Sequence, residues 1–253
     1  MSRPECLSLD FQGQHIAGVR YAATEPASNC AMLVHGFSAT RTGTGRAFVD
    51  LAQLLTKSGC TVYAFDRLGH GESDGRFLDV TVPGELDQLS AMLDYVLAQG
   101  DGSLHLLGHS LGGMEAAYLC GQRHGDIDSL TLWAPAAVFM DDIKNNEIQG
   151  ESLSSARETG VFDFNGQALG IAYVDTVSGF NPYDGIDAFK GNVWLHQGEV
   201  DPIVPMECAE RYAEIWSENA TLYRYPKANH GWNRLADRTL LLQRSAVNIC
   251  GNL

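Results

Sequence analysis

The stretch SLHLLGHSLGGMEAAYLCGQRH, residues 103–124, begins with an apolar run, passes through a turn of small residues and continues as a helix-length segment. Its centre, GHSLG, matches G-x-S-x-G, the pentapeptide that can lift a serine onto a sharp turn between a strand and a helix. Gly108 and Gly112 suit such a turn, because Cβ atoms at these positions would collide with the neighbouring strand and helix. Ser110 is therefore the candidate nucleophile.

The same pattern occurs again as GESDG, residues 71–75. Its Ser73 follows DRLGHG, lies between two acidic residues and stands several residues before the next helix-like segment. Two carboxylates beside a nucleophile would oppose the oxyanion that the nucleophile must generate. We therefore predict a loop at this position and assign the nucleophile to Ser110.

Short apolar runs separated by helix-length segments extend along most of the chain, and such runs are typical of strands buried on both faces of a parallel sheet. The runs are AMLVHGF, TVYAFD, LHLLGHS, LTLWAPA, VWLHQG and TLYRYP, and the alternating CLSLDF and HIAGVRY before them predict an N-terminal β-hairpin. Amphipathic helices are expected at roughly 45–58, 83–99, 112–124, 206–217 and 238–250. This order predicts an α/β fold with a mostly parallel, doubly wound sheet whose functional groups lie at the carboxyl ends of the strands.

The length of the chain fits one α/β domain, which we predict over residues 1–253. One segment, at about 138–190, is too long for a single crossover and mixes acidic, small polar and isolated aromatic residues. A connection of this length inside a compact domain is usually a lid or a binding insertion. We therefore predict a lid or cap insertion within the domain.

The composition is acidic, with 31 Asp and Glu against 17 Lys and Arg and a net charge of -14. Such a charge disfavours nucleic acids and anionic lipid surfaces as partners. No apolar run approaches the roughly 18 residues of a membrane span, and the opening MSRPECLSLDFQG lacks the apolar region of a signal peptide. The scattered cysteines favour free thiols in a reducing, cytoplasmic location. The oligomeric state is left open, a homodimer included.

A serine hydroxyl becomes a good nucleophile when a base takes its proton, and the base works best when a buried acid fixes its tautomer. In an enzyme whose nucleophile lies on such a strand-to-helix turn of this fold, these residues follow the order serine, acid, histidine. Asp201, in HQGEVDPIVP directly after an apolar run, is the predicted acid, with Glu199 as the alternative. His230, in KANHGW, is the only histidine of the sequence after Asp201 and is the predicted base.

An oxyanion needs backbone N–H donors that are already in place. We predict these donors to be the N–H of Leu111, directly after the nucleophile, and the N–H of Phe37, in HGF after the run AMLV. His35, His70 and His109 adjoin loops at the same end of the sheet. We expect these histidines to order backbone rather than to transfer protons, because an isolated histidine is more often a structural group than a catalyst.

Taken in order, HGFSAT, FDRLGHGESDG, GHSLGG, APA, GEVDPIVP and ANHGW resemble the motifs of the serine α/β-hydrolase superfamily. Within it, FDRLGHGESDG, APAAVFMDD and GQALGIAYVDTVSGFNPYDGIDAF resemble small intracellular bacterial cinnamoyl or feruloyl esterases. This resemblance implies a lid over the nucleophile whose polar groups hold the phenolic end of a hydroxycinnamoyl group, and by position it points to Asp142, Gln149 and Tyr173. For Asp142 a solvated surface acid is the alternative. Relatives often carry Gln or Met in place of Leu111, which leaves the acyl preference open.

The activity implied is hydrolysis of a small-molecule ester, with an aromatic acyl group, through an acyl-enzyme on Ser110. The triad chemistry requires no metal and no organic cofactor. A general carboxylesterase or a monoacylglycerol lipase would share every catalytic motif, and a serine peptidase or a carbon–carbon hydrolase would use similar machinery. A ligand receptor on a hydrolase scaffold, with slow turnover, is the alternative of a different class.

Overall fold

A computed structural model of the protein describes residues 3–24, 27–177 and 179–251. Residues 1–2, 25–26 and 252–253 of the predicted domain range lie outside the described residues, as does residue 178 of the predicted insertion. Among the described residues, no helix has both the length and the hydrophobicity required to cross a membrane. Cys30, Cys60 and Cys120 are buried and free, which agrees with the predicted free thiols.

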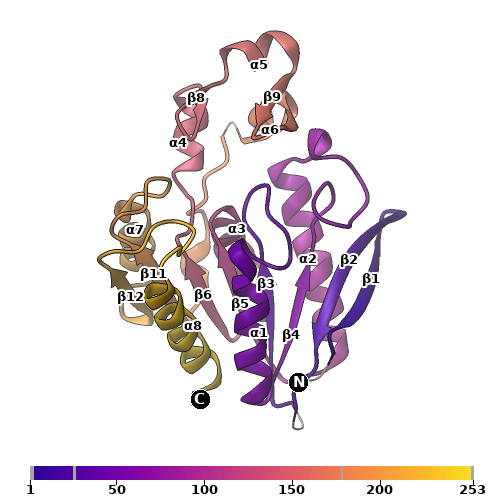
Figure 1. Cartoon of the computed structure of the whole chain (residues 1–253), viewed down its shortest axis with the longest axis vertical. Coiled ribbons are helices and arrows are strands. Elements are labelled where there is room, and N and C mark those ends of the chain that lie inside the picture. Colours follow the sequence, from indigo (N-terminus) through magenta and orange to yellow (C-terminus); the bar gives the residue numbers. More distant parts are fainter. Residues whose placement is uncertain (1–2, 25–26, 178, 252–253) are drawn as a thin grey trace.

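The centre of the described chain is an eight-stranded sheet with the strand order β1-β2-β4-β3-β5-β6-β11-β12 (Figure 1). β1 and β2 form an antiparallel hairpin and β2 pairs antiparallel with β4, whereas the other neighbours are parallel. The sheet strands are β1 (Glu5–Phe11), β2 (Gln14–Tyr21), β3 (Asn29–Val34), β4 (Cys60–Phe65), β5 (Ser103–His109), β6 (Ser129–Trp133), β11 (Asn192–Gly198) and β12 (Ala220–Tyr225). The predicted fold class is confirmed, including the N-terminal hairpin.

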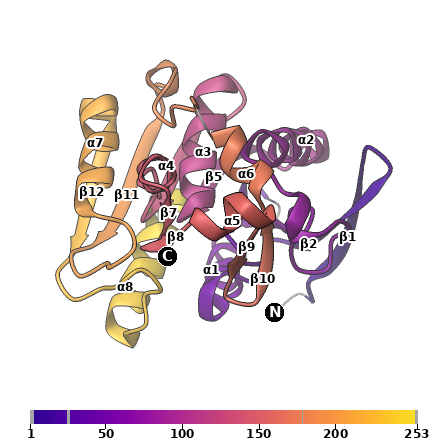
Figure 2. The same cartoon turned by 90° about the horizontal axis from the view of Figure 1, so that it is seen from above.

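Helices cover both faces of the sheet, as Figure 2 shows from above. Apolar side chains of α2, α3 and α7 pack on one face, and those of α1 and α8 pack on the other. All six residues of β4 are buried, which explains why its sequence is an unbroken apolar run without alternation. The helices are α1 (Ala47–Lys57), α2 (Val82–Gln99), α3 (Leu111–Gln122), α7 (Met206–Trp216) and α8 (Leu235–Cys250).

The predicted helices are found with small differences at their ends. α2 begins after Thr81, whose hydroxyl accepts a hydrogen bond from the Gly84 N–H at 3.2 Å, with proline in the first turn. α8 begins at Leu235, earlier than predicted, because the exposed first turn has no apolar periodicity to mark it. Short 3-10 helices occur at η1 (Thr44–Arg46), η2 (Phe77–Asp79), η3 (Ile186–Ala188) and η4 (Ser217–Asn219).

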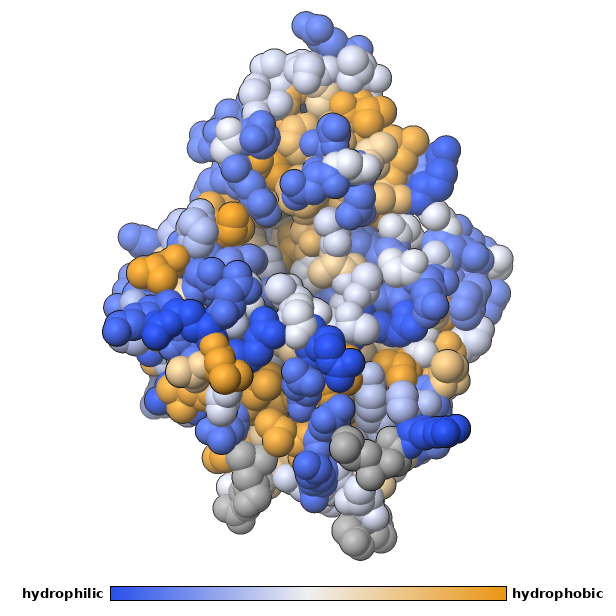
Figure 3. Space-filling model, in the orientation of Figure 1, coloured by the Kyte–Doolittle hydropathy of each residue, from blue (hydrophilic) through white to orange (hydrophobic). Residues whose placement is uncertain are grey.

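The 138–190 segment rises above the carboxyl ends of the strands (Figure 1). Its apolar residues share a buried cluster with Phe77, Leu111 and Met114 of the rest of the chain. Figure 3 shows a hollow between this segment and the body of the molecule, with hydrophobic residues inside it. The segment contains α4 (Phe139–Lys144), β7 (Glu147–Ile148), β8 (Glu151–Ser152), α5 (Ser154–Thr159), β9 (Val161–Phe164), β10 (Gln167–Gly170) and α6 (Ile171–Val177). That it acts as a lid stays a prediction.

The turn between β5 and α3 is tightly packed. Ser110 has φ 59° and ψ −125°, a strained conformation that points its side chain away from strand and helix. A Cβ atom at Gly108 would lie 2.2 Å from the Gly112 carbonyl oxygen. The Ser110 N–H donates to the Trp133 carbonyl at 2.8 Å, which fastens Ser110 to the end of β6. These contacts hold the candidate nucleophile at the top of the sheet.

Replacement of Gly108 with alanine tests this packing. The added methyl group can be accommodated only if β5 and α3 move apart, so we expect Gly108→Ala to lower the free energy of unfolding by about 3 kcal/mol or more. Gly125→Ala is the control, because an added Cβ there meets none of the described heavy atoms within 4 Å. Urea unfolding followed by tryptophan fluorescence measures both. Equal stability of the two variants would contradict the close approach.

Candidate active site

The structure brings the three predicted triad residues together. His230 Nε2 lies 2.9 Å from Ser110 Oγ, and His230 Nδ1 lies 2.9 Å from Asp201 Oδ2. Ser110 follows β5 and Asp201 follows β11, and these strands are both neighbours of β6 in the sheet. The parallel direction of the strands therefore places a hydroxyl, an imidazole and a carboxylate in one hydrogen-bonded chain.

Asp201 is held as an anion. Burial alone would raise the pKa of Asp201, but the hydrogen bond and charge of His230, together with backbone N–H groups, hold that pKa below its ordinary value. Its Oδ1 accepts from the N–H groups of Ile203 and Val204 at 2.8 and 2.9 Å. An ionised Asp201 requires a proton on His230 Nδ1, so Nε2 is left to accept the proton of Ser110.

His109 supports the loop that carries His230. The two rings stack with centroids 5.1 Å apart, and His109 Nε2 lies 3.2 Å from the His230 carbonyl oxygen. Burial, with a contribution from the charge of His230, lowers the pKa of His109 to about 3. A neutral His109 that donates from Nε2 orders this backbone, as the sequence analysis expected of it.

Leu111 directly follows the candidate nucleophile, and the loop that carries Phe37 approaches it closely. Leu111 begins α3, where the first N–H groups of a helix have no partner within the helix. Gly36, directly before Phe37, lies so close to Ser110 that an added Cβ would be 3.1 Å from the Ser110 Cβ. These positions suit two N–H donors that converge on one oxyanion, and that role remains a prediction.

An aromatic cluster surrounds the Phe37 side chain. The Phe37 ring centroid lies 4.8 to 5.5 Å from the ring centroids of Phe77, Phe139, Phe164 and Tyr173. Phe139, Phe164 and Tyr173 all belong to the 138–190 segment, so this segment contacts the loop that follows β3. The resemblance pointed to Tyr173 as a substrate-binding residue, which stays a prediction. Nothing in the sequence pointed to Phe139 and Phe164, because an isolated aromatic in an irregular segment gives no sign of the ring that it contacts.

Ser73, the serine of the second G-x-S-x-G pattern, is bound to the backbone. Its Oγ donates to the Asp66 carbonyl at 2.6 Å and accepts from the Ala17 N–H at 2.8 Å. The residues around it form turns and bends, which confirms the predicted loop. Ser73 therefore fastens the 66–75 loop to β2.

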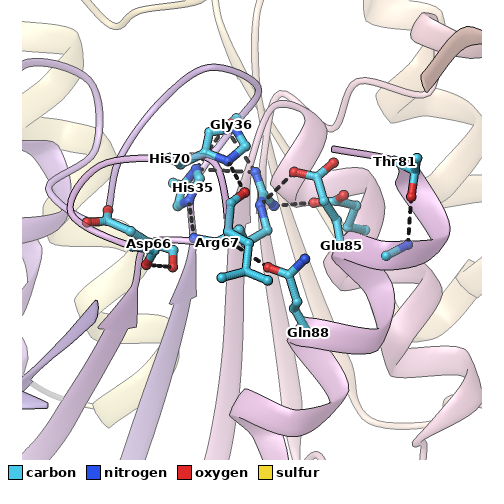
Figure 4. A network of polar contacts seen from close by, with 12 residues as sticks. His35, Gly36, Asp66, Arg67, His70, Thr81, Glu85 and Gln88 are labelled. Carbon is cyan, nitrogen blue, oxygen red and sulfur yellow. Dashed lines mark hydrogen bonds and ion pairs between the residues drawn. The ribbon is translucent and has the colours of Figure 1, made fainter. Parts of the chain in front are cut away.

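The loop of residues 66–75 also holds a buried ionic network that sequence analysis missed (Figure 4). Arg67 is 1% exposed and forms ion pairs with Glu85 of α2 and Glu115 of α3. His70 Nδ1 contacts the Leu68 carbonyl at 3.2 Å, and the Leu68 N–H donates to Gln88 of α2 at 2.7 Å. A charged residue in a polar loop is usually solvated, so the sequence carried no signal for this burial.

The three residues suggested for substrate binding fall into two groups. Asp142 is half-buried and accepts a hydrogen bond from the Gln149 N–H at 3.2 Å, and burial raises the pKa of Asp142. Tyr173 is fully buried, with its ring against Phe37 and Phe139 and its hydroxyl near the carboxyl group of Glu85. Their roles toward a substrate remain predictions.

In sequence, the chain is similar to known hydrolases. The profile of the alpha/beta hydrolase fold family matches residues 32–172. The chain is 33% identical over 136 residues to lipase LipV of Mycobacterium tuberculosis, which is 54% of this chain and 47% of LipV. It is also 33% identical over 95 residues to a pyrethroid hydrolase of Sphingobium wenxiniae, which is 38% of this chain and 31% of that protein. These matches span less than half the length of either relative.

A solved structure of Est1E from Butyrivibrio proteoclasticus, with ferulic acid bound, has a TM-score of 0.89 and 21% identity, and the match covers 97% of this chain and 98% of that chain. At this identity the similarity concerns the fold. With the family profile matching more than half of its length, the chain belongs to the α/β hydrolase fold family.

Proposed function

We propose that the protein is a serine hydrolase of carboxylic esters that acts through an acyl-enzyme on Ser110. The observation that carries the proposal is the hydrogen-bonded chain from Ser110 through His230 to Asp201, with 2.9 Å at each step. An ionised Asp201 supports it, because this carboxylate stabilises the imidazolium that forms during the reaction. Membership of the α/β hydrolase fold family also supports this chemistry.

In the first half of the proposed reaction, His230 Nε2 takes the hydroxyl proton as Ser110 Oγ attacks the ester carbonyl carbon. The negative oxygen of the tetrahedral intermediate accepts hydrogen bonds from the N–H groups of Phe37 and Leu111, each contributing about 3 kcal/mol to lowering the barrier. The protonated His230 then gives its proton to the leaving alkoxide, and the alcohol departs.

In the second half, His230 takes a proton from water, which attacks the acyl-enzyme carbonyl. The same two N–H groups bind the second oxyanion, and the proton returns to Ser110 Oγ as the carboxylic acid leaves. The nucleophile, the base and the oxyanion donors all come from the protein, so this mechanism uses no metal and no organic cofactor.

We propose hydroxycinnamoyl esters, such as feruloyl esters, as the substrate class. The aromatic rings around Phe37 suit a planar aromatic acyl group, because aromatic rings stack favourably at centroid distances of about 4.5 to 7 Å. Phe164, one of these rings, also lines a cavity of about 450 Å³ together with Gln149 and Phe162, within the 138–190 segment and apart from the triad. The shared fold with Est1E, which binds ferulic acid, adds support.

Within this proposal Asp142 and Gln149 hold the phenolic hydroxyl, whereas Tyr173 contributes its ring to the apolar wall. The identity to a lipase favours a second candidate, a general carboxylesterase or monoacylglycerol lipase. A panel of methyl ferulate, methyl caffeate, methyl cinnamate, short acyl esters and monoacylglycerols distinguishes the two. The first proposal expects the highest kcat/KM with the hydroxycinnamates. A preference for glyceryl esters would replace it with the second.

Substitution of the two candidate serines tests the nucleophile. Ser110→Ala should lower kcat at least about 10⁴-fold and abolish labelling by a fluorophosphonate probe, because it removes the attacking oxygen. Ser73→Ala should keep kcat near that of the unmodified protein but lower the free energy of unfolding by about 1 to 3 kcal/mol, since the buried Ala17 N–H loses its acceptor. Loss of turnover in Ser73→Ala with retention in Ser110→Ala would refute the assignment.

The low pKa of Asp201 leads to a prediction about pH. A depressed carboxyl pKa keeps Asp201 ionised well below neutral pH, and His109, with a pKa of about 3, stays neutral there. Neither Asp201 nor His109 should then titrate near neutral pH, so the acid side of the plot of log kcat/KM against pH should rise with a slope no greater than one. A slope of two would show that a second group titrates.

Asp201→Asn should lower kcat by on the order of 10⁴-fold with little change in fold.

The proposed phenol contact is tested at Asp142. Asp142→Asn should reduce kcat/KM for methyl caffeate about tenfold more than for methyl cinnamate, because a hydrogen bond to a charged group contributes about 1.5 to 3 kcal/mol. Asp141→Asn is the matched control, since the carboxylate of Asp141, next to Asp142 in the sequence, pairs instead with Lys144 on the exposed side of α4. Equal effects of Asp142→Asn on the two esters would remove Asp142 from phenol recognition.

A further inference from the structure

We propose that Arg67 is a positioning residue for the oxyanion hole, and that it acts on the Gly36–Phe37 peptide from inside the molecule. The inference rests on the proposed function, because it takes the Phe37 N–H as an oxyanion donor. It assigns a catalytic purpose to an ionic network that the triad mechanism does not use.

One peptide group, between Gly36 and Phe37, connects Arg67 to the proposed oxyanion hole. Arg67 Nη2 donates to the Gly36 carbonyl oxygen at 3.1 Å. The Gly36 carbonyl and the Phe37 N–H belong to the same planar, trans peptide, in which they point in opposite directions. A donor that fixes the carbonyl therefore fixes the direction of the N–H. Because the donor is a cation, it also polarises the peptide and strengthens the N–H as a donor.

His35 supplies a second donor to the same carbonyl. Burial, then the charge of Arg67, lowers the pKa of His35 well below its ordinary value, so the ring is neutral. His35 Nε2 accepts from the Arg67 backbone N–H at 3.2 Å, which leaves the ring proton on Nδ1. This Nδ1 lies 2.9 Å from the Gly36 carbonyl oxygen, and the Ala39 N–H approaches that oxygen at 3.3 Å. The carbonyl is thus held from several directions, with Arg67 as the cationic donor.

Arg67 is held in place by two buried carboxyl groups. Figure 4 shows its guanidinium between Gly36 and Glu85. Arg67 Nε lies 3.0 Å from Glu85 Oε1, and Nη1 pairs with Glu115. Glu115 lies on α3, the helix that begins at Leu111. The network therefore connects both proposed oxyanion donors, the N–H groups of Phe37 and Leu111, to the same helix.

The positive charge of Arg67 lies between two buried carboxyl groups. Both carboxyl groups are fully buried, and burial raises the pKa of Glu115 well above its ordinary value, an effect that Arg67 partly offsets and that neighbouring Glu85 increases. Burial opposes the charge of Arg67, but the neighbouring Glu115 and Glu85 hold the pKa of Arg67 above its ordinary value. An unpaired buried charge would be strongly destabilising, so the pair keeps Arg67 charged and fixed beside the carbonyl.

Arg67→Met tests the inference, because methionine keeps the length of the side chain but removes the charge and the donors. Displacement of the Phe37 N–H should lower kcat on the order of 10²-fold, with KM within about threefold. Affinity for a trifluoromethyl ketone, which forms an oxyanion on Ser110, should fall by the same factor as kcat/KM, whereas affinity for the product acid should hold.

Arg123→Met is the matched control. Arg123, directly after α3, contacts Ser90 and Asp94 of α2 and the nearby Asp126, and none of these contacts within the described part of the chain reaches the loop at Gly36. Its loss should lower thermal stability and leave kcat and ketone affinity within about twofold of the unmodified protein. If Arg67 had a structural role alone, Arg67→Met would match this pattern, and the inference would be overturned.

Arg67→Lys keeps the test decisive if Arg67→Met does not fold. Lysine retains the charge without the planar fork, so kcat should fall by an intermediate factor. Labelling with carbonyl-¹³C glycine and ¹⁵N phenylalanine gives two Gly-Phe signals, from Gly36–Phe37 and Gly179–Phe180, because the sequence contains these two pairs alone. In Arg67→Lys the chemical shifts of the Gly36–Phe37 signal should change, whereas those of the Gly179–Phe180 signal should not. An unmoved first signal with unchanged kcat would overturn the inference.

Failure of the inference is distinct from failure of the proposed function. An active unmodified protein with a folded, fully active Arg67→Met variant would exclude the role of Arg67 and leave the Ser110 mechanism in place. A raised KM with unchanged kcat would also exclude it, since Arg67 would then act on substrate binding. Absence of ester turnover and of fluorophosphonate labelling in the unmodified protein would overturn the proposed function itself.

Discussion

The close approach of α3 to the end of β3 is the constraint on which the candidate site depends. A Cβ at Gly112 would lie 2.1 Å from the His35 carbonyl oxygen, so the first turn of the helix lies directly on strand backbone. This contact brings the loop after β3 beside Ser110. A larger residue at position 112 would separate the two proposed oxyanion donors, because Leu111 lies on α3 and Phe37 lies on the loop after β3.

The buried charges beneath this contact are difficult to explain by stability alone. Desolvation of a guanidinium and two carboxyl groups costs several kcal/mol per ion, and hydrophobic residues of similar volume often stabilise a protein more. In some proteins such a network is retained because its geometry serves another purpose. Here Arg67 joins α2, α3 and the loop at Gly36, so the same interactions that are costly for folding give the loop a fixed position relative to Ser110.

The sequence predicted the sheet because buried parallel strands appear as continuous apolar runs, and β4 is buried at every position. The sequence also distinguished the two serines, because a strand and a helix flank Ser110 whereas acidic residues flank Ser73. Arg67 could not be found in this way. Its partners lie on two distant helices, and their burial depends on how those helices pack over the loop rather than on any local pattern. The direction of the Tyr173 hydroxyl depends on tertiary packing for the same reason.

Phe37 connects the two sides of the candidate site. Its backbone is held through Gly36 by Arg67 and His35, while its ring is held by aromatic side chains of the 138–190 segment. These rings also exclude water from the neighbourhood of the proposed oxyanion donor. Because electrostatic interactions are stronger where water is absent, the N–H of Phe37 would stabilise an oxyanion more effectively under this aromatic cover than in an open loop. An aromatic acyl group bound there would extend the same cover, so substrate binding and oxyanion stabilisation would reinforce one another through a single residue.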